Sequence, residues 1–175
     1  LHQVLVQLAE DRIPLSDIAL ILESIVNHAP ESKSSEELTD CVRRDLGRLV
    51  CERFRGEDGR LRVVSMEPRL DIRLRQSIQK DQLALEVGSA TRMIEAIHTA
   101  WKDSERRQLP LALLVDQKIR RPLRRLIART TPGIGVIAYQ EVPDDLIIDS
   151  VVMLEYQEII REEAGSENRQ MREAA

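Results

Sequence analysis

The chain has 175 residues, of which 42% are hydrophobic, with a formal net charge of -4 and a pI of about 5.5. This length allows one sizeable domain or two small ones, and the acidic balance argues against nucleic acid as the main partner. Only 2% of the residues are aromatic, so the chain lacks a stacking platform for single-stranded nucleic acid, and aliphatic side chains must build the core.

Three amphipathic helices are predicted at the start of the chain. Apolar residues recur at helical spacing in residues 1–8, 18–29 and 38–54. Short connections between such helices predict a small bundle in which each helix buries one stripe.

Proline and serine residues mark the limits of these helices. Pro14 and Pro30 interrupt the helical pattern, and Ser16 is the expected N-cap of the second helix. Ser34 followed by Glu37 is a capping-box pattern, which places the start of the third helix.

A turn-rich connection at residues 55–60, which contains two glycines, is the predicted domain boundary. We therefore expect a helical subdomain over residues 1–57, an α/β subdomain over 58–155 and a charged C-terminal tail over 156–175. The tail is nearly free of bulky apolar residues, which is typical of a frayed end.

The centre of the second subdomain is expected in residues 110–144. Two apolar runs of strand length, Leu111–Val115 and Ile134–Tyr139, flank a helical stripe that includes Ile119 and Leu123. Strand, helix and strand with short connections form a crossover unit, so the two strands should be parallel and buried.

Further elements are predicted around this unit. Leu61–Met66 and Leu146–Met153 should be strands, residues 68–78 a short helix, residues 79–87 an extended piece and residues 90–101 a helix. The predicted fold class is therefore α+β, with a three-helix bundle followed by a small α/β subdomain that has a partly parallel sheet.

Positive charge gathers on two of the predicted helices. The helix of the crossover unit carries Lys118, Arg120, Arg121, Arg124, Arg125 and Arg129, and only Asp116 opposes them within the segment. Either this is a solvated outer face, or it is a docking surface for an acidic partner protein. Pro122 should lie near the helix start, so the regular helix is expected to begin near Arg120 or Arg121.

The third helix carries Arg43, Arg44 and Arg48 beside Asp40 and Asp45. Two interpretations are open: pairing within the helix, or charge matching between copies in an oligomer.

No catalytic, metal or cofactor motif is present in the sequence. Phosphate loops, dinucleotide loops and HExxH are absent, and His2, His28 and His98 have no ligand-like spacing. Cys41 and Cys51 do not form a CxxC pair, which argues against a zinc site. We expect no enzyme activity and no cofactor.

The two cysteines also bear on compartment. On one helix they would lie about 15 Å apart along the axis, too far for a disulfide, which favours a reducing environment. No signal peptide is visible, and no apolar run reaches the ~20 residues needed to span a bilayer. The chain starts within an amphipathic pattern, as expected of an excised fragment.

Three stretches resemble a known family. Val4–Pro30 resembles a segment of the export-gate proteins of type III secretion, with Arg12, Asp17 and Glu23 in place. Val42, Arg43 and Leu46 resemble the segment that follows. Leu114–Pro143 resembles the family's strand, basic helix, strand and YQEVP-like ending.

The resemblance implies the third and fourth cytosolic subdomains of an inner-membrane export apparatus protein, shared by injectisomes and the flagellar apparatus. It implies a homo-oligomeric ring of nine subunits on the cytoplasmic face of the bacterial inner membrane, a role in protein transport and, in the injectisome branch that we favour, in virulence. The implied partners are chaperone–substrate complexes, a gatekeeper and the export ATPase stalk. No catalytic residue and no direct membrane contact are implied for this part.

On this basis the candidates for the oligomer interface are Arg12, Asp17, Arg43, Arg44 and Arg48. The candidates for partner docking are Arg120, Arg121, Arg124 and Arg125. Pro14, Ser16 and Pro122 depart from the family pattern.

Three other interpretations remain at this point. One is the flagellar counterpart, another a winged-helix-like nucleic-acid-binding regulator, and the third a small α/β enzyme.

Overall fold

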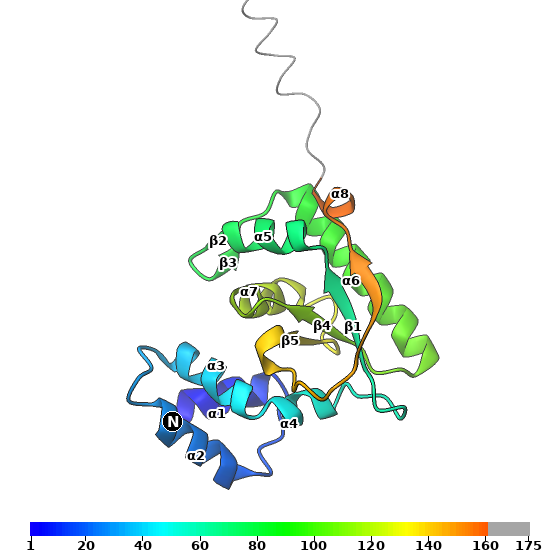
Figure 1. The fold of residues 1–175 in the computed structure, drawn as a ribbon. Coiled ribbons are helices and arrows are strands. Elements are labelled where there is room, and N and C mark those ends of the chain that lie inside the picture. Colours follow the sequence, from blue (N-terminus) through cyan, green and yellow to red (C-terminus); the bar gives the residue numbers. More distant parts are fainter. Residues whose placement is uncertain (161–175) are drawn as a thin grey trace, which may run out of the picture.

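Four helices precede the first strand in the computed structural model, which describes residues 1–160 (Figure 1). They are α1 (His2–Glu10), α2 (Ile18–His28), α3 (Ser35–Asp45) and α4 (Gly47–Glu52). Most of the predicted charged tail lies outside the described residues.

The sequence suggested that the third helix continues to Phe54, but in the structure this segment forms two helices, α3 and α4. It divides at Leu46, whose backbone leaves the helical region with φ -84° and ψ 12°. Gly47 begins α4 directly against the backbone of Glu141, where a Cβ would come within 2.2 Å of the carbonyl oxygen. The division therefore falls where α4 packs closely against Glu141, which is far away in the sequence.

The starts of the helices agree with the predicted caps at one position and differ at another. Ser34 accepts a hydrogen bond from the backbone N–H of Glu37, as predicted for α3. The N-cap of α2 is Asp17 rather than Ser16, because its carboxylate accepts from the backbone N–H of Leu20 at 3.2 Å.

A four-stranded sheet forms the middle of the molecule. It consists of β1 (Leu61–Met66), β4 (Ala112–Val115), β5 (Gly135–Ala138) and β6 (Ile148–Leu154), in the order β5-β4-β1-β6. All three neighbouring pairs are parallel, so the crossover prediction is confirmed and extends to the whole sheet. The predicted α+β class is also confirmed.

The remaining elements are α5 (Pro68–Gln76), the hairpin of β2 (Ile78–Gln79) and β3 (Gln82–Leu83), α6 (Val87–Arg107), α7 (Gln117–Ile127), the 3₁₀ helix η1 (Tyr139–Glu141) and α8 (Tyr156–Ile159).

The start predicted for α7 was wrong. It begins at Gln117, with Asp116 as its N-cap, and Pro122 lies inside it. Pro122 is only the sixth residue of α7, so its missing N–H costs one bond after the first turn.

The sheet separates two apolar clusters. Leu61, Val63, Ala112, Leu114 and Ile137 face α1–α4 on one side. Val64, Leu113 and Val115 face α5–α8 on the other. Because successive strand residues point to opposite faces, β1, β4 and β5 each contribute to both cores, whereas β6 contributes only Leu154, to the second. The helices on either side of the predicted boundary at residues 57 and 58 therefore sandwich one sheet (Figure 1).

Candidate functional site

A buried cluster of ion pairs joins the α1–α4 layer to the rest of the chain. At its centre is Arg43 of α3, whose exposed fraction is 2%. It donates from Nε and Nη2 to the two carboxylate oxygens of Glu141, at 2.6 and 2.8 Å. Its Nη1 donates to Asp11 at 2.7 Å. The bidentate interaction with Glu141 fixes both the position and the plane of the Arg43 guanidinium.

Arg120 of α7 reaches the same cluster from the other side. It is also 2% exposed, and its two Nη atoms donate to Asp11 and Asp40, each at 2.8 Å. Arg121 lies 2.9 Å from Asp40 and donates to the backbone carbonyl of Glu36. The basic face of α7 is therefore matched by acidic side chains of α1 and α3.

Three different elements position the carboxylates of this cluster. Asp11 is the C-cap of α1, Asp40 lies within α3, and Glu141 ends η1. Glu141 also accepts from the backbone N–H of Ala138 at 3.1 Å. With Arg121 included, three guanidiniums face three carboxylates, so the buried charge is balanced.

Burial and pairing act in opposite directions on the pKa of Arg43. Burial lowers the pKa of the guanidinium, but the hydrogen bond and charge of Glu141 and the charge of Asp11 outweigh it, so the pKa is raised. Nearby, burial and the charge of Glu141 raise the pKa of the Cys51 thiol to about 12. Both groups therefore keep their protons near neutral pH, and Cys51 is present there as the thiol.

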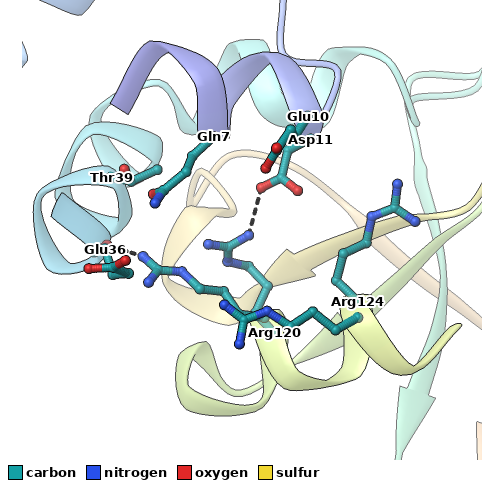
Figure 2. A pocket seen from close by; sticks show the side chains of 9 residues that line it. Gln7, Glu10, Asp11, Glu36, Thr39, Arg120 and Arg124 are labelled. Atoms are coloured by element: carbon teal, nitrogen blue, oxygen red, sulfur yellow. Dashed lines mark hydrogen bonds and ion pairs between the residues drawn. The ribbon is translucent and has the colours of Figure 1, made fainter. Parts of the chain in front are cut away.

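A cavity of about 140 Å³ opens beside this cluster (Figure 2). Gln7, Glu10 and Asp11 line it from α1, Glu36 and Thr39 from α3, and the arginines from α7. Three buried polar atoms at this place have no hydrogen-bond partner among the described residues: Gln7 Oε1, Arg120 Nε and Arg124 Nη1. The cavity is polar and mixed in charge, which suits contact with a charged side chain more than an apolar ligand.

A second feature is the outer face of α2, which we define as Ile18, Leu22 and Val26. These residues follow each other at intervals of four, and their exposed fractions are 44%, 39% and 70%. Together they form a continuous apolar stripe beside the buried stripe of Ile21 and Ile25. Such a stripe is typical of a contact surface.

The predicted interface residues occupy different environments. Arg43 faces carboxylates of its own chain, so its assignment to contacts between copies is revised. Arg48 is exposed and bonds Asp145 of the same chain at 3.0 Å, and Arg44 is exposed with only a weak bond to Cys41. Asp17 caps α2. Arg12 is exposed, with a φ of 58° at the turn after α1.

The predicted docking residues on α7 also separate into two groups. Arg120 is buried and Arg121 half-buried, and both are occupied by ion pairs within the chain, so the docking role is revised for Arg120. Arg125 is exposed and donates to the carbonyl of Asp81. For Arg121, Arg124 and Arg125 docking stays a prediction.

Sequence reasoning missed Asp11, Asp40 and Glu141 as members of this cluster. Glu141 lies in the YQEVP segment that carried part of the resemblance, and this was the only available signal for its importance.

Within residues 1–160, no group of three or more His, Cys, Asp or Glu side chains is arranged to hold a metal ion. In the same part of the chain, no helix combines the length and the apolar character needed to cross a membrane.

The fold and the site define an α+β module whose arginines tie its layers together and whose α2 outer face is exposed among residues 1–160. The chain belongs to the FHIPEP family, whose model matches residues 1–146. It is 32% identical to the flagellar biosynthesis protein FlhA of Yersinia enterocolitica over 145 residues, which is 83% of this chain and 21% of that protein. It is also 32% identical to the protein HrpC2 of Xanthomonas euvesicatoria over 152 residues, 85% of this chain and 23% of that protein. The chain thus spans about a fifth of the length of these relatives.

Solved structures give the same fold. The Shigella flexneri MxiA protein matches with a TM-score of 0.74 at 26% identity, over 86% of this chain and 48% of that chain. The nonameric EPEC SctV-C matches with a TM-score of 0.72 at 21% identity, over 86% and 46%. The Chlamydia pneumoniae CdsV protein, solved in complex with CdsO, matches with a TM-score of 0.67 at 25% identity, over 86% and 45%.

Proposed function

We propose that this chain is a ring-forming cytosolic part of the export gate of a type III secretion system, on the injectisome side of the family. The observation that carries the proposal is the outer face of α2, an apolar stripe with no cover within the described chain. Membership of the FHIPEP family and a fold shared with a nonameric protein support it.

The proposed mechanism is docking, without bond-making chemistry. Copies would assemble through α2 below the inner membrane, and the ring would receive chaperone–substrate complexes, a gatekeeper and the ATPase stalk. The complex of CdsV with CdsO supports the idea that members bind further proteins of the system. Arg125, which is exposed on α7, is our candidate for contact with an acidic carrier.

The test of ring formation is the substitution Val26→Asp. A charge at Val26, the most exposed residue of the α2 outer face, should abolish contact between copies, because an unpaired carboxylate would be buried there. Sedimentation velocity and negative-stain electron microscopy over a range of concentrations should show rings or oligomers for the wild-type chain and monomers for the variant.

The control is Val87→Asp at the start of α6, where an 81% exposed valine lies outside α2. It should assemble like the wild type, and both variants should unfold at the same denaturant concentration as the wild type. A wild-type chain that stays monomeric at the highest attainable concentration would contradict the proposal, as would equal assembly of both variants.

A further inference from the structure

Beside the buried cluster lie Arg12, Arg53 and Arg124, which have no carboxylate partner among residues 1–160. Arg12, Arg53 and Arg124 form no hydrogen bond or ion pair through their guanidiniums with any residue in the described part of the chain. Arg53 lies over the ring of Phe54 at 5.3 Å, and Nη1 of Arg124 is buried without an acceptor. This sets them apart from Arg43 and Arg120, each of which forms ion pairs with at least two carboxylates of the chain.

The three side chains come from separate elements that meet beside Asp11. Arg12 and Arg53 line one small hollow of about 20 Å³, together with the apolar side chains of Pro14 and Phe54. Arg124 lines the adjoining 140 Å³ cavity, and Asp11 borders both. Burial and the positive charges of Arg12 and Arg124 lower the pKa of Arg53, which indicates that the three charges act on one another.

The acidic groups nearby do not neutralise this arginine cluster. Asp11 is the only carboxylate that lines the hollow of Arg12 and Arg53, and it is already bonded to Arg43 and Arg120. Glu10 and Glu36 stand on the side of the larger cavity. Like charges held together are stabilised when an anion from outside the chain joins them.

We propose that Arg12, Arg53 and Arg124 bind a carboxylate of a second copy of this chain, and that Glu23 on α2 supplies it. This rests on the proposed ring and assigns the receiving side of its interface. Glu23 is exposed and has no ion pair within residues 1–160. It lies one turn from Val26 of the α2 outer face, so apolar contact and charge pairing would occur together.

The two surfaces also account for the geometry of a ring. A contact between the α2 outer face of one copy and the arginine cluster of the next joins two different patches. Such a heterologous contact repeats from copy to copy and closes into a ring when the rotation allows. The receiving side combines apolar Pro14 and Phe54 with positive charge, which complements an apolar stripe that carries a glutamate.

The first experiment is disulfide trapping in the full chain with Cys41→Ser. Copies with Glu23→Cys are mixed with mass-tagged copies with Arg53→Cys, and the cross-linked heterodimer is measured by mass spectrometry. Both positions are exposed, so the variants should fold. The matched control replaces Glu23→Cys by Glu31→Cys, another exposed acidic position, just after α2.

We expect several-fold more heterodimer with the cysteine at position 23 than with that at position 31. Equal yields would overturn the inference, because trapping detects weak association as well. The proposed ring would still stand if Val26→Asp weakens assembly in that case, so the two failures are distinguishable.

Charge reversal provides the second arm. Arg53→Glu and Glu23→Arg should each lower the self-association constant at least severalfold, and the double variant should recover much of it, since every contact then pairs opposite charges again. Additive losses in the double variant, measured by sedimentation, would contradict direct pairing.

Discussion

Arg43 and Arg44 are neighbours on α3, yet they have opposite roles. Arg43 is 2% exposed and holds Glu141 and Asp11, whereas Arg44 points outward and touches only the sulfur of Cys41. One step along a helix turns a side chain by about 100°. That rotation decides whether an arginine ties the layers of this fold together or remains available to solvent.

The comparison teaches that charge alone does not identify an interface. A buried pair is poor evidence for net stability, but removing one partner leaves the other charge buried without compensation. An exposed arginine can be removed at almost no cost. Substitutions of Arg43 and Arg44 should therefore distinguish an arginine that stabilises the fold from one that is free to contact other molecules.

The largest effect is expected for Arg43→Met, which keeps the volume and removes the charge. Glu141, whose exposed fraction is 3%, would lose its bidentate partner and remain buried as an unpaired charge. The free energy of unfolding should therefore fall by about 3–5 kcal/mol. Urea denaturation followed by circular dichroism measures it.

The matched control is Arg44→Met, which should change the free energy of unfolding by less than about 0.5 kcal/mol. The double variant Arg43→Met with Glu141→Met should be less destabilised than the sum of the two single variants, because neither charge of this pair is then buried without the other. Equal stabilities of Arg43→Met and Arg44→Met would show that the buried pairing has no structural weight.

A smaller effect is expected for Gly47→Ala, which strains the same cluster from the backbone side. The new Cβ would lie 2.2 Å from the carbonyl oxygen of Glu141, so η1 must move and the chain should lose about 1–3 kcal/mol. Chemical denaturation measures this loss.

Gly88→Ala on α6 is the control for this experiment. Its Cβ would meet the flexible end of Arg92 at 3.1 Å and the Glu86 carboxylate at an ordinary 3.6 Å, so no loss is expected. A Gly47→Ala chain as stable as the wild type would mean that α4 and η1 can separate freely.

Local sequence patterns were sufficient for most of the fold. The apolar runs at residues 111–115 and 134–139 gave the parallel strands, because continuous apolar strands require cover on both faces. The caps and stripes of the first helices gave the α1–α4 layer. These signals extend over a few residues, within the reach of helical and strand periodicity.

Most of the buried ion-pair cluster could not be predicted from local patterns, because its members are far apart in the sequence. Arg43 and Glu141 are 98 residues apart in sequence, and Arg120 and Asp11 are 109 apart. Nothing in the local pattern of Arg43 distinguishes it from Arg44, so both were assigned to contacts between copies. The break before Gly47 has the same origin, because the atom that excludes a Cβ there belongs to Glu141.

The smallest expected effect concerns the reactivity of the thiols of Cys41 and Cys51, which differ in burial and can report on the different roles of Arg43 and Arg44. Cys51 is 1% exposed, donates to the carbonyl of Glu141 at 3.7 Å and has a pKa raised to about 12, whereas Cys41 is half-buried on α3. At pH 8 Cys51 would therefore be almost entirely in the thiol form, whereas the thiolate is the form that reacts. A disulfide reagent such as DTNB should therefore label one thiol per folded chain and two after unfolding in urea.

Cys41→Ser should abolish the fast phase of labelling and leave the slow one, which identifies the reactive thiol. In Arg43→Met the slow phase should accelerate, because the loosened cluster opens more often and exposes Cys51, whereas Arg44→Met should leave it unchanged. Equal rates for both thiols in the folded wild type would contradict the buried environment of Cys51. An unchanged slow phase in a destabilised Arg43→Met chain would mean that Arg43 secures α3 to η1 without controlling access to α4, and so would divide the buried cluster into two independent parts.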